Sequence, residues 1–182
     1  MATVLIPLAQ GCEELEAVTL IDILRRAEIE VTVAGLDDQP VIASRGVVLV
    51  PDTDLDSALK NDYDMIVLPG GLEGTENLNK DARIHSRLKQ MHSQGQYTAA
   101  ICAAPRVLAE AGLLANKQAT SYPTVLEQLN IPDITYIDAP IIEDDKVITS
   151  RGPGTALDFA LHLAERLVGQ EVRQQVEAGL VR

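Results

Sequence analysis

The side chain best suited to chemistry in this sequence is a cysteine at the end of a short apolar segment. Residues 97–105 read Tyr-Thr-Ala-Ala-Ile-Cys-Ala-Ala-Pro, which predicts a strand that stops at Cys102 and turns at once into a helix. Pro105 suits the first turn of a helix, where no backbone N–H is needed. Unpaired N–H groups and the helix dipole favour a thiolate there, so we expect the Cys102 pKa to lie below the free value of about 8.5. The alternative is a buried small hydrophobe, the usual state of a lone cysteine.

A thiolate that attacks a carbonyl group also needs donors for the resulting oxyanion. Pro69-Gly70-Gly71 follows the apolar segment Met65 to Leu68, and its glycines leave the backbone N–H groups accessible. Together with the N–H of Ala103, they are candidate oxyanion donors. A tight turn without a ligand is the alternative. A phosphate loop is disfavoured because no lysine stands in place and Glu73 would repel phosphate.

A carboxyl group is the candidate for moving the proton. The segment Glu13-Glu14-Leu15-Glu16 opens the first predicted helix, where the dipole favours acidic residues in any case. Glu16 has a register that can face inward, and burial there would raise its pKa and let it donate a hydrogen bond to sulfur. Periodicity alone does not choose Glu16 over Glu13 or Glu14. The histidines and the run Asp52 to Asp56 do not have metal-ligand spacing, and no metal site is expected.

Apolar strands alternate with amphipathic helices along the whole chain, with no linker or repeat. This pattern predicts a single α/β domain over residues 1–182, with a mostly parallel sheet covered on both faces. The expected strands are 4–8, 30–35, 65–68, 97–101, 134–137, 141–142 and 147–149, with a hairpin over 41–50, and the expected helices are 14–27, 82–93, 105–114, 155–168 and 170–178. In such sheets function gathers beyond the carboxyl ends of the strands, so residues 9–13, 69–74 and Cys102 are expected to meet.

Composition narrows the class of partner. The 182 residues include 27 acidic and 15 basic side chains, and the net charge of −12 disfavours nucleic acid and anionic membranes. No segment approaches the roughly 20 apolar residues of a membrane span, and the first residues do not read as a signal peptide. The two cysteines form no CxxC pair, so we expect a cytoplasmic protein with reduced thiols.

In combination these segments resemble the ThiJ/PfpI superfamily, in the branch of human Parkinson-disease protein seven and the bacterial YajL-type proteins. The matching stretches are GCEELEAV (11–18), SRG (44–46), VLPGG (67–71), AAICAAP (99–105) and TSRGPGT (149–155), which span essentially the whole chain. The resemblance implies a flavodoxin-like three-layer sandwich and a homodimer, and no cofactor is expected.

The resemblance also implies roles for individual residues. Cys102 matches the nucleophilic and oxidation-sensitive cysteine, Glu16 the partner carboxyl, and Gly71 and Ala103 the backbone donors. The residues expected to line the site are Gly70, Tyr122, Arg45, Arg151 and Pro153. Ala103 stands where protease-like members have a histidine, which argues against peptidase chemistry. Tyr122 stands where the human-type members have a histidine, and Cys12 where they have a small residue.

Members of this family are described as glyoxalases or protein deglycases, so the resemblance implies small 2-oxoaldehydes, or glycated thiols and amines, as substrates. Methylglyoxal and glyoxal are the expected compounds. The alternative that the resemblance leaves open is an oxidative-stress sensor or chaperone whose output is the oxidation state of Cys102.

Overall fold

A seven-stranded sheet forms the centre of the fold in a computed structural model that describes residues 1–182. Its strand order is β10-β11-β7-β6-β1-β2-β5, and every neighbouring pair is parallel except β10 with β11. The strands are β1 (Thr3–Leu8), β2 (Glu30–Gly35), β5 (Thr53–Asp54), β6 (Met65–Leu68), β7 (Tyr97–Ile101), β10 (Ile141–Asp144) and β11 (Val147–Ser150). The predicted α/β class with a mostly parallel sheet is confirmed.

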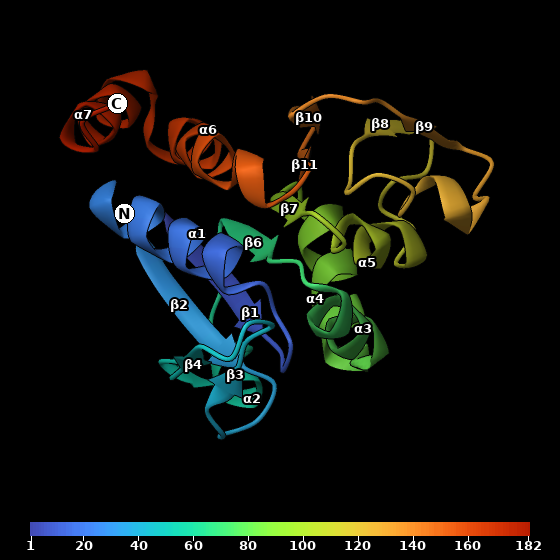
Figure 1. The fold of residues 1–182 in the computed structure, drawn as a ribbon, viewed down its shortest axis with the longest axis horizontal. Coiled ribbons are helices and arrows are strands. Elements are labelled where there is room, and N and C mark those ends of the chain that lie inside the picture. Colours follow the sequence, from blue (N-terminus) through green and yellow to red (C-terminus); the bar gives the residue numbers. More distant parts are fainter.

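Helices cover both faces of this sheet (Figure 1). One face carries α1 (Glu14–Arg26), α6 (Ala156–Val168) and α7 (Gln170–Gly179), and the other carries α2 (Leu55–Ala58), α3 (Leu72–Lys80), α4 (Ala82–Ser93) and α5 (Pro105–Glu110). Successive side chains of a strand point to opposite faces, so Val4 and Ile6 of β1 join the first core while Leu5 joins the second. None of the helices combines the length and apolar character needed to cross a lipid bilayer.

Two small sheets lie outside the central one. The expected hairpin forms from β3 (Val41–Ile42) and β4 (Val48–Leu49), while β8 (Lys117–Ala119) pairs in parallel with β9 (Ile134–Tyr136). Short 3₁₀ helices span Glu127–Leu129 and Pro153–Thr155. The expected strand over 134–137 forms as β9, and it pairs with β8, a strand that was not expected, rather than with the central sheet.

Two helices around the site differ from expectation. The helix after Cys102 ends at Glu110 rather than near residue 114, and Gly112 follows with a φ of 84°, a left-handed conformation that cannot continue a helix. Helix α3 was not expected, since Leu78 is its only buried large apolar side chain. It is held instead by small residues, because Gly74 lies so close to Cys12 that an added Cβ would stand 2.6 Å from the Cys12 Cα.

The sheet order places the predicted loops together. The chain runs from β1 to β2 on one side and later adds β6 on the other side of β1, which is a topological switch point. There the N–H of Glu13 donates to the carbonyl of Gly70 at 3.0 Å, and the N–H of Gly74 donates to that of Gly11 at 3.2 Å. Because β7 pairs with β6, Cys102 ends beside the same loops. The expectation that these three segments meet is confirmed.

Candidate active site

Cys102 occupies a strained turn at the carboxyl end of β7. Its φ is 65°, in the left-handed region that residues with a side chain seldom adopt, and its N–H donates to the carbonyl of Ser150 at 3.0 Å. Only 8% of the residue is exposed. As in the nucleophile elbow of hydrolases, the sharp turn holds the side chain at the carboxyl end of the sheet, at the edge of the core that α1 and α6 cover. Helix α5 begins three residues later, at Pro105.

Glu16 is the acidic residue that the structure brings to this cysteine. It is fully buried, and its Oε2 accepts a hydrogen bond from the N–H of Gly70 at 2.8 Å. Its Oε1 is also buried and accepts no hydrogen bond from any N–H or O–H group. The other two acids do not bond to the Cys102 loop: Glu13 accepts from the N–H of Leu15, and Glu14 accepts from the N–H of Arg45 at 2.7 Å. The choice that periodicity left open is therefore decided by burial.

Glycine at position 70 lets the cysteine and the carboxyl approach each other. A Cβ on Gly70 would stand 2.7 Å from both the Cβ of Cys102 and Oε2 of Glu16, closer than real side chains allow. Gly71 has a φ of 89°, and an added Cβ there would meet the backbone of Gly11 and Glu13. The N–H groups of Gly71 and Ala103 both donate to the sulfur of Cys102. Both N–H groups therefore face the sulfur.

Burial controls the ionisation of the pair. It raises the pKa of Glu16 to about 7, against hydrogen bonds from Gly70 and Cys102 that lower it. Burial, followed by the negative charge of Glu16, raises the pKa of Cys102 to about 12, and the hydrogen bonds from Gly71 and Ala103 only partly offset this. The expectation of a lowered thiol pKa is therefore wrong. Desolvation and the adjacent carboxylate raise the pKa of Cys102 by more than the amino terminus of the six-residue helix α5 lowers it.

Near neutral pH the two groups consequently behave as one unit. The unit loses one proton near pH 7, and that loss leaves a carboxylate beside a thiol within hydrogen-bonding reach. With these pKa values, a thiolate would form by transfer of the thiol proton to Glu16. Attack by the sulfur and protonation of the carboxyl are thus expected to occur together.

The pair lies under a cavity of about 430 Å³. Its lining residues are Gly11, Glu13, Ser44, Arg45, Gly71, Leu72, Glu73, Cys102, Ala103, Tyr122 and Pro153. Tyr122 is half-exposed at the rim, and its backbone N–H donates to the carbonyl of Cys102 at 2.7 Å. Of the expected lining residues, Arg45, Tyr122 and Pro153 are present.

Two expected lining residues lie elsewhere. Gly70 is beneath the cavity, where it binds Glu16, and the guanidinium of Arg151 pairs with Asp138 at 2.7 Å and does not reach the cavity. Leu72 and Glu73 line the cavity but were not expected to, since they belong to α3, which the sequence did not predict. Their position in the sequence, directly after Pro69-Gly70-Gly71, was the signal that could have identified these two residues.

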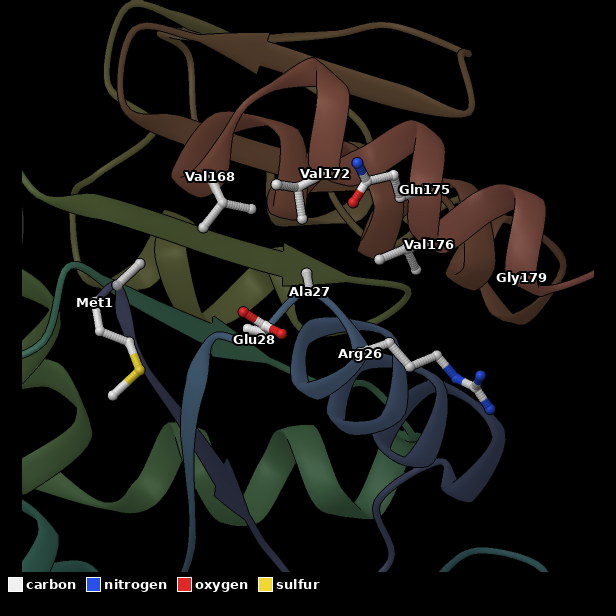
Figure 2. A pocket seen from close by; sticks show the side chains of 10 residues that line it. Met1, Arg26, Ala27, Glu28, Val168, Val172, Gln175, Val176 and Gly179 are labelled. Atoms are coloured by element: carbon white, nitrogen blue, oxygen red, sulfur yellow. The ribbon is translucent and has the colours of Figure 1, made fainter.

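A larger cavity, of about 680 Å³, lies where the amino terminus meets the ends of α1 and α7. Figure 2 shows Val168, Val172 and Val176 lining it opposite Ala27. It contains no cysteine, histidine or buried carboxyl. The smaller cavity, over Cys102, is therefore the candidate active site.

The second cysteine is not positioned for the same role. Cys12 is fully buried and does not line the cavity over Cys102. Burial and the negative charge of Glu14 raise its pKa to about 11. Both cysteines are free thiols in the structure.

Fold and site together define a class: flavodoxin-like α/β proteins with a cysteine and a buried carboxyl at the carboxyl edge of the sheet. The chain belongs to the DJ-1/PfpI family, whose sequence profile matches residues 2–166. It is 46% identical to Drosophila melanogaster protein DJ-1alpha over 179 residues, covering 97% of this chain and 82% of the relative. It is 36% identical to the Caenorhabditis elegans glutathione-independent glyoxalase DJR-1.2 over 170 residues, covering 93% and 90%. The crystal structure of Drosophila melanogaster DJ-1beta superimposes with a TM-score of 0.95 at 44% identity, covering 99% of this chain and 97% of that one.

Proposed function

We propose that this protein converts small 2-oxoaldehydes, free or as early adducts of thiols and amines, into 2-hydroxy acids without a cofactor. The observation that carries the proposal is the Glu16 carboxyl, buried beside Cys102 with a pKa of about 7 and one oxygen free of N–H or O–H partners. A general acid–base is most effective when its pKa lies near the working pH. The similarity to a glutathione-independent glyoxalase supports the same reaction class.

The first step joins substrate and enzyme. The sulfur of Cys102 bonds to the aldehyde carbon while its proton passes to the Glu16 carboxylate, and the carbonyl oxygen becomes the hydroxyl of a hemithioacetal. The N–H groups of Gly71 and Ala103, which donate to the sulfur in the free protein, would stabilise the negative oxygen during this addition.

The second step moves a proton between the two carbons. The Glu16 carboxylate, after returning its first proton to the new oxygen, removes the hydrogen from the sulfur-bearing carbon. An enediolate forms, and the hydroxyl proton of the sulfur-bearing carbon moves to the neighbouring oxygen. The Glu16 carboxyl then gives its proton to the neighbouring carbon, which leaves a thioester of the 2-hydroxy acid and restores the carboxylate. Water adds to the thioester and releases the acid and the thiol, so the net reaction is addition of one water to the oxoaldehyde. No electron donor or acceptor is consumed.

Steady-state turnover of methylglyoxal by the reduced protein tests this function. We expect lactate to form with the wild type, and Cys102→Ser to lower kcat/KM to the background rate, because an alcohol is a far weaker nucleophile than a thiol assisted by Glu16. Cys12→Ser is the matched control and should retain turnover, since Cys12 does not line the cavity. Equal turnover by wild type and Cys102→Ser would exclude the proposal.

A sensor or chaperone controlled by oxidation of Cys102 is the second candidate. It is favoured by one observation: the cavity reaches Cys102 but not Cys12, so an oxidant meets a single thiol. The same assay separates the two functions, because catalysis requires turnover at a fixed oxidation state and sensing does not.

We also propose that the active form is a homodimer. Exposed apolar side chains gather on α1 and on the adjoining β3–β4 hairpin: Leu15, Val18, Ile42, Val47, Val48 and Val50. The hairpin is tied to the start of α1, because Ser44 donates to Glu14 at 2.8 Å. Grouped apolar surface of this kind is typical of a subunit interface. Light scattering at micromolar concentration should give twice the 19.6 kDa chain mass, and a monomer mass would contradict the proposal.

A further inference from the structure

Three charged side chains line the cavity above Cys102, and two of them are negative. Glu13 and Glu73 are negative and Arg45 is positive, and none of the three is in an ion pair. Glu13 accepts from the hydroxyl of Ser44 at 3.1 Å, while the guanidinium of Arg45 contacts only the carbonyl of Ser44, at 3.4 Å. The charges at the mouth of the cavity are therefore not neutralised by neighbours.

The side chain of Glu73 is exposed and lies over the cavity wall. It lies on Gly11, where a Cβ would stand 2.5 Å from the Glu73 Cβ and 2.8 Å from its Oε2. Gly11 and Glu73 both line the cavity, so the carboxylate sits at its mouth. The negative charge of Glu13 also raises the pKa of Glu16, which favours the protonated carboxyl. The net charge of −12 on the chain adds to this negative potential.

We propose that Glu73, together with Glu13, selects the charge of the substrate, so that Cys102 reacts with neutral or cationic electrophiles in preference to anionic ones. The inference rests on the proposed function. Among the substrates of that function, it favours uncharged 2-oxoaldehydes and adducts on amines over oxoaldehydes that carry a carboxylate or a phosphate. Glu73 acts here as a specificity residue and takes no part in the chemical steps.

Alkylation of Cys102 by two reagents of similar size and different charge tests the selection without requiring turnover. Iodoacetamide is neutral and iodoacetate is anionic, and with both the sulfur forms a bond to the CH₂ carbon as iodide leaves. Peptide mass spectrometry gives the rate constant for alkylation of Cys102 by each reagent. The rate constant with iodoacetate is divided by that with iodoacetamide, and this ratio is then divided by the same ratio for a small neutral thiol. We expect a normalised ratio of about one-third or less at low salt, since one exposed unit charge a few ångströms away changes such a rate about threefold.

Substitutions at Glu73, compared with one of equal charge change at a distant position, identify the residue responsible. Glu73→Gln should raise the normalised ratio about threefold, and Glu73→Lys about tenfold. Glu171→Gln is the control, because Glu171 is exposed at the start of α7, away from this cavity, and should leave the ratio unchanged. Sodium chloride at about 1 M should remove most of the difference, since the Debye length falls to about 3 Å. A wild-type ratio of one or more, or equal effects of Glu73→Gln and Glu171→Gln, would overturn the proposal, and a ratio above one would assign carboxylate binding to Arg45.

The substrate arm compares methylglyoxal with 4,5-dioxopentanoate, a 2-oxoaldehyde with a carboxylate. Wild type should favour methylglyoxal in kcat/KM, and Glu73→Gln should narrow the preference about threefold. If neither compound is turned over, the proposed function fails while the alkylation ratio still decides the charge selection. If both are turned over equally well by wild type, the charge selection fails and the proposed function stands.

Discussion

Replacement of Glu16 by glutamine is expected to lower kcat/KM for methylglyoxal by about a hundredfold or more, the usual effect of removing a general base. Glutamine has nearly the same shape, and its carbonyl oxygen can accept the Gly70 N–H that Oε2 accepts in the wild type. It cannot take the proton of Cys102 or move a proton between substrate carbons. The loss should therefore appear mainly in kcat, with the fold and the cavity preserved.

The pH profile gives this prediction a second readout. In the wild type, kcat/KM should rise through about pH 7 as Glu16 becomes a carboxylate, and this inflection should be absent from the Glu16→Gln variant. Tyr122→Phe is the matched control, since it removes a polar group from the cavity rim without touching the pair, and should cost only a few-fold. Near-wild-type turnover in Glu16→Gln, with turnover lost in Cys102→Ser, would show that the carboxyl is structural.

The same substitution is expected to stabilise the protein above pH 7, by up to about 3 kcal/mol. Burial raises the pKa of Glu16 from 4.5 to about 7, so the folded state binds this proton more tightly than the unfolded state. The stabilising contribution of the protonated carboxyl is complete below about pH 4.5 and is lost as pH rises to about 7. Above that pH the folded wild type holds a buried carboxylate, whereas glutamine stays neutral.

Urea unfolding of both proteins at pH 5 and pH 8 measures this effect. The difference in the free energy of unfolding, Glu16→Gln minus wild type, should be larger at pH 8, because the exposed carboxyls are common to both proteins and cancel. A difference that does not change with pH would mean that Glu16 titrates as an exposed residue does, and would remove the basis for its role as a base. A gain in stability with a loss of turnover would instead show that the buried carboxyl is kept for chemistry.

The elements whose apolar pattern is local were predictable from the sequence. The bounds of β2, β6 and α4 match the predicted residues, because each segment buries its own regular set of side chains. Helix α3 was not predicted, because it is held in place by the close approach of Gly74 to Cys12. Cys12 lies more than sixty residues earlier in the chain. A helix packed through small residues has little apolar periodicity to detect.

For the candidate site, the sequence by itself determined which cysteine ends a strand and which loops share an edge of the sheet. Only the tertiary structure decided which acid meets that cysteine, since Glu16 and Gly70 are 54 residues apart and all three acids suit a helix start. It also reversed the expected direction of the Cys102 pKa. The reason is physical: strand and turn propensities depend on neighbouring residues, whereas desolvation and charge proximity depend on segments brought together by folding.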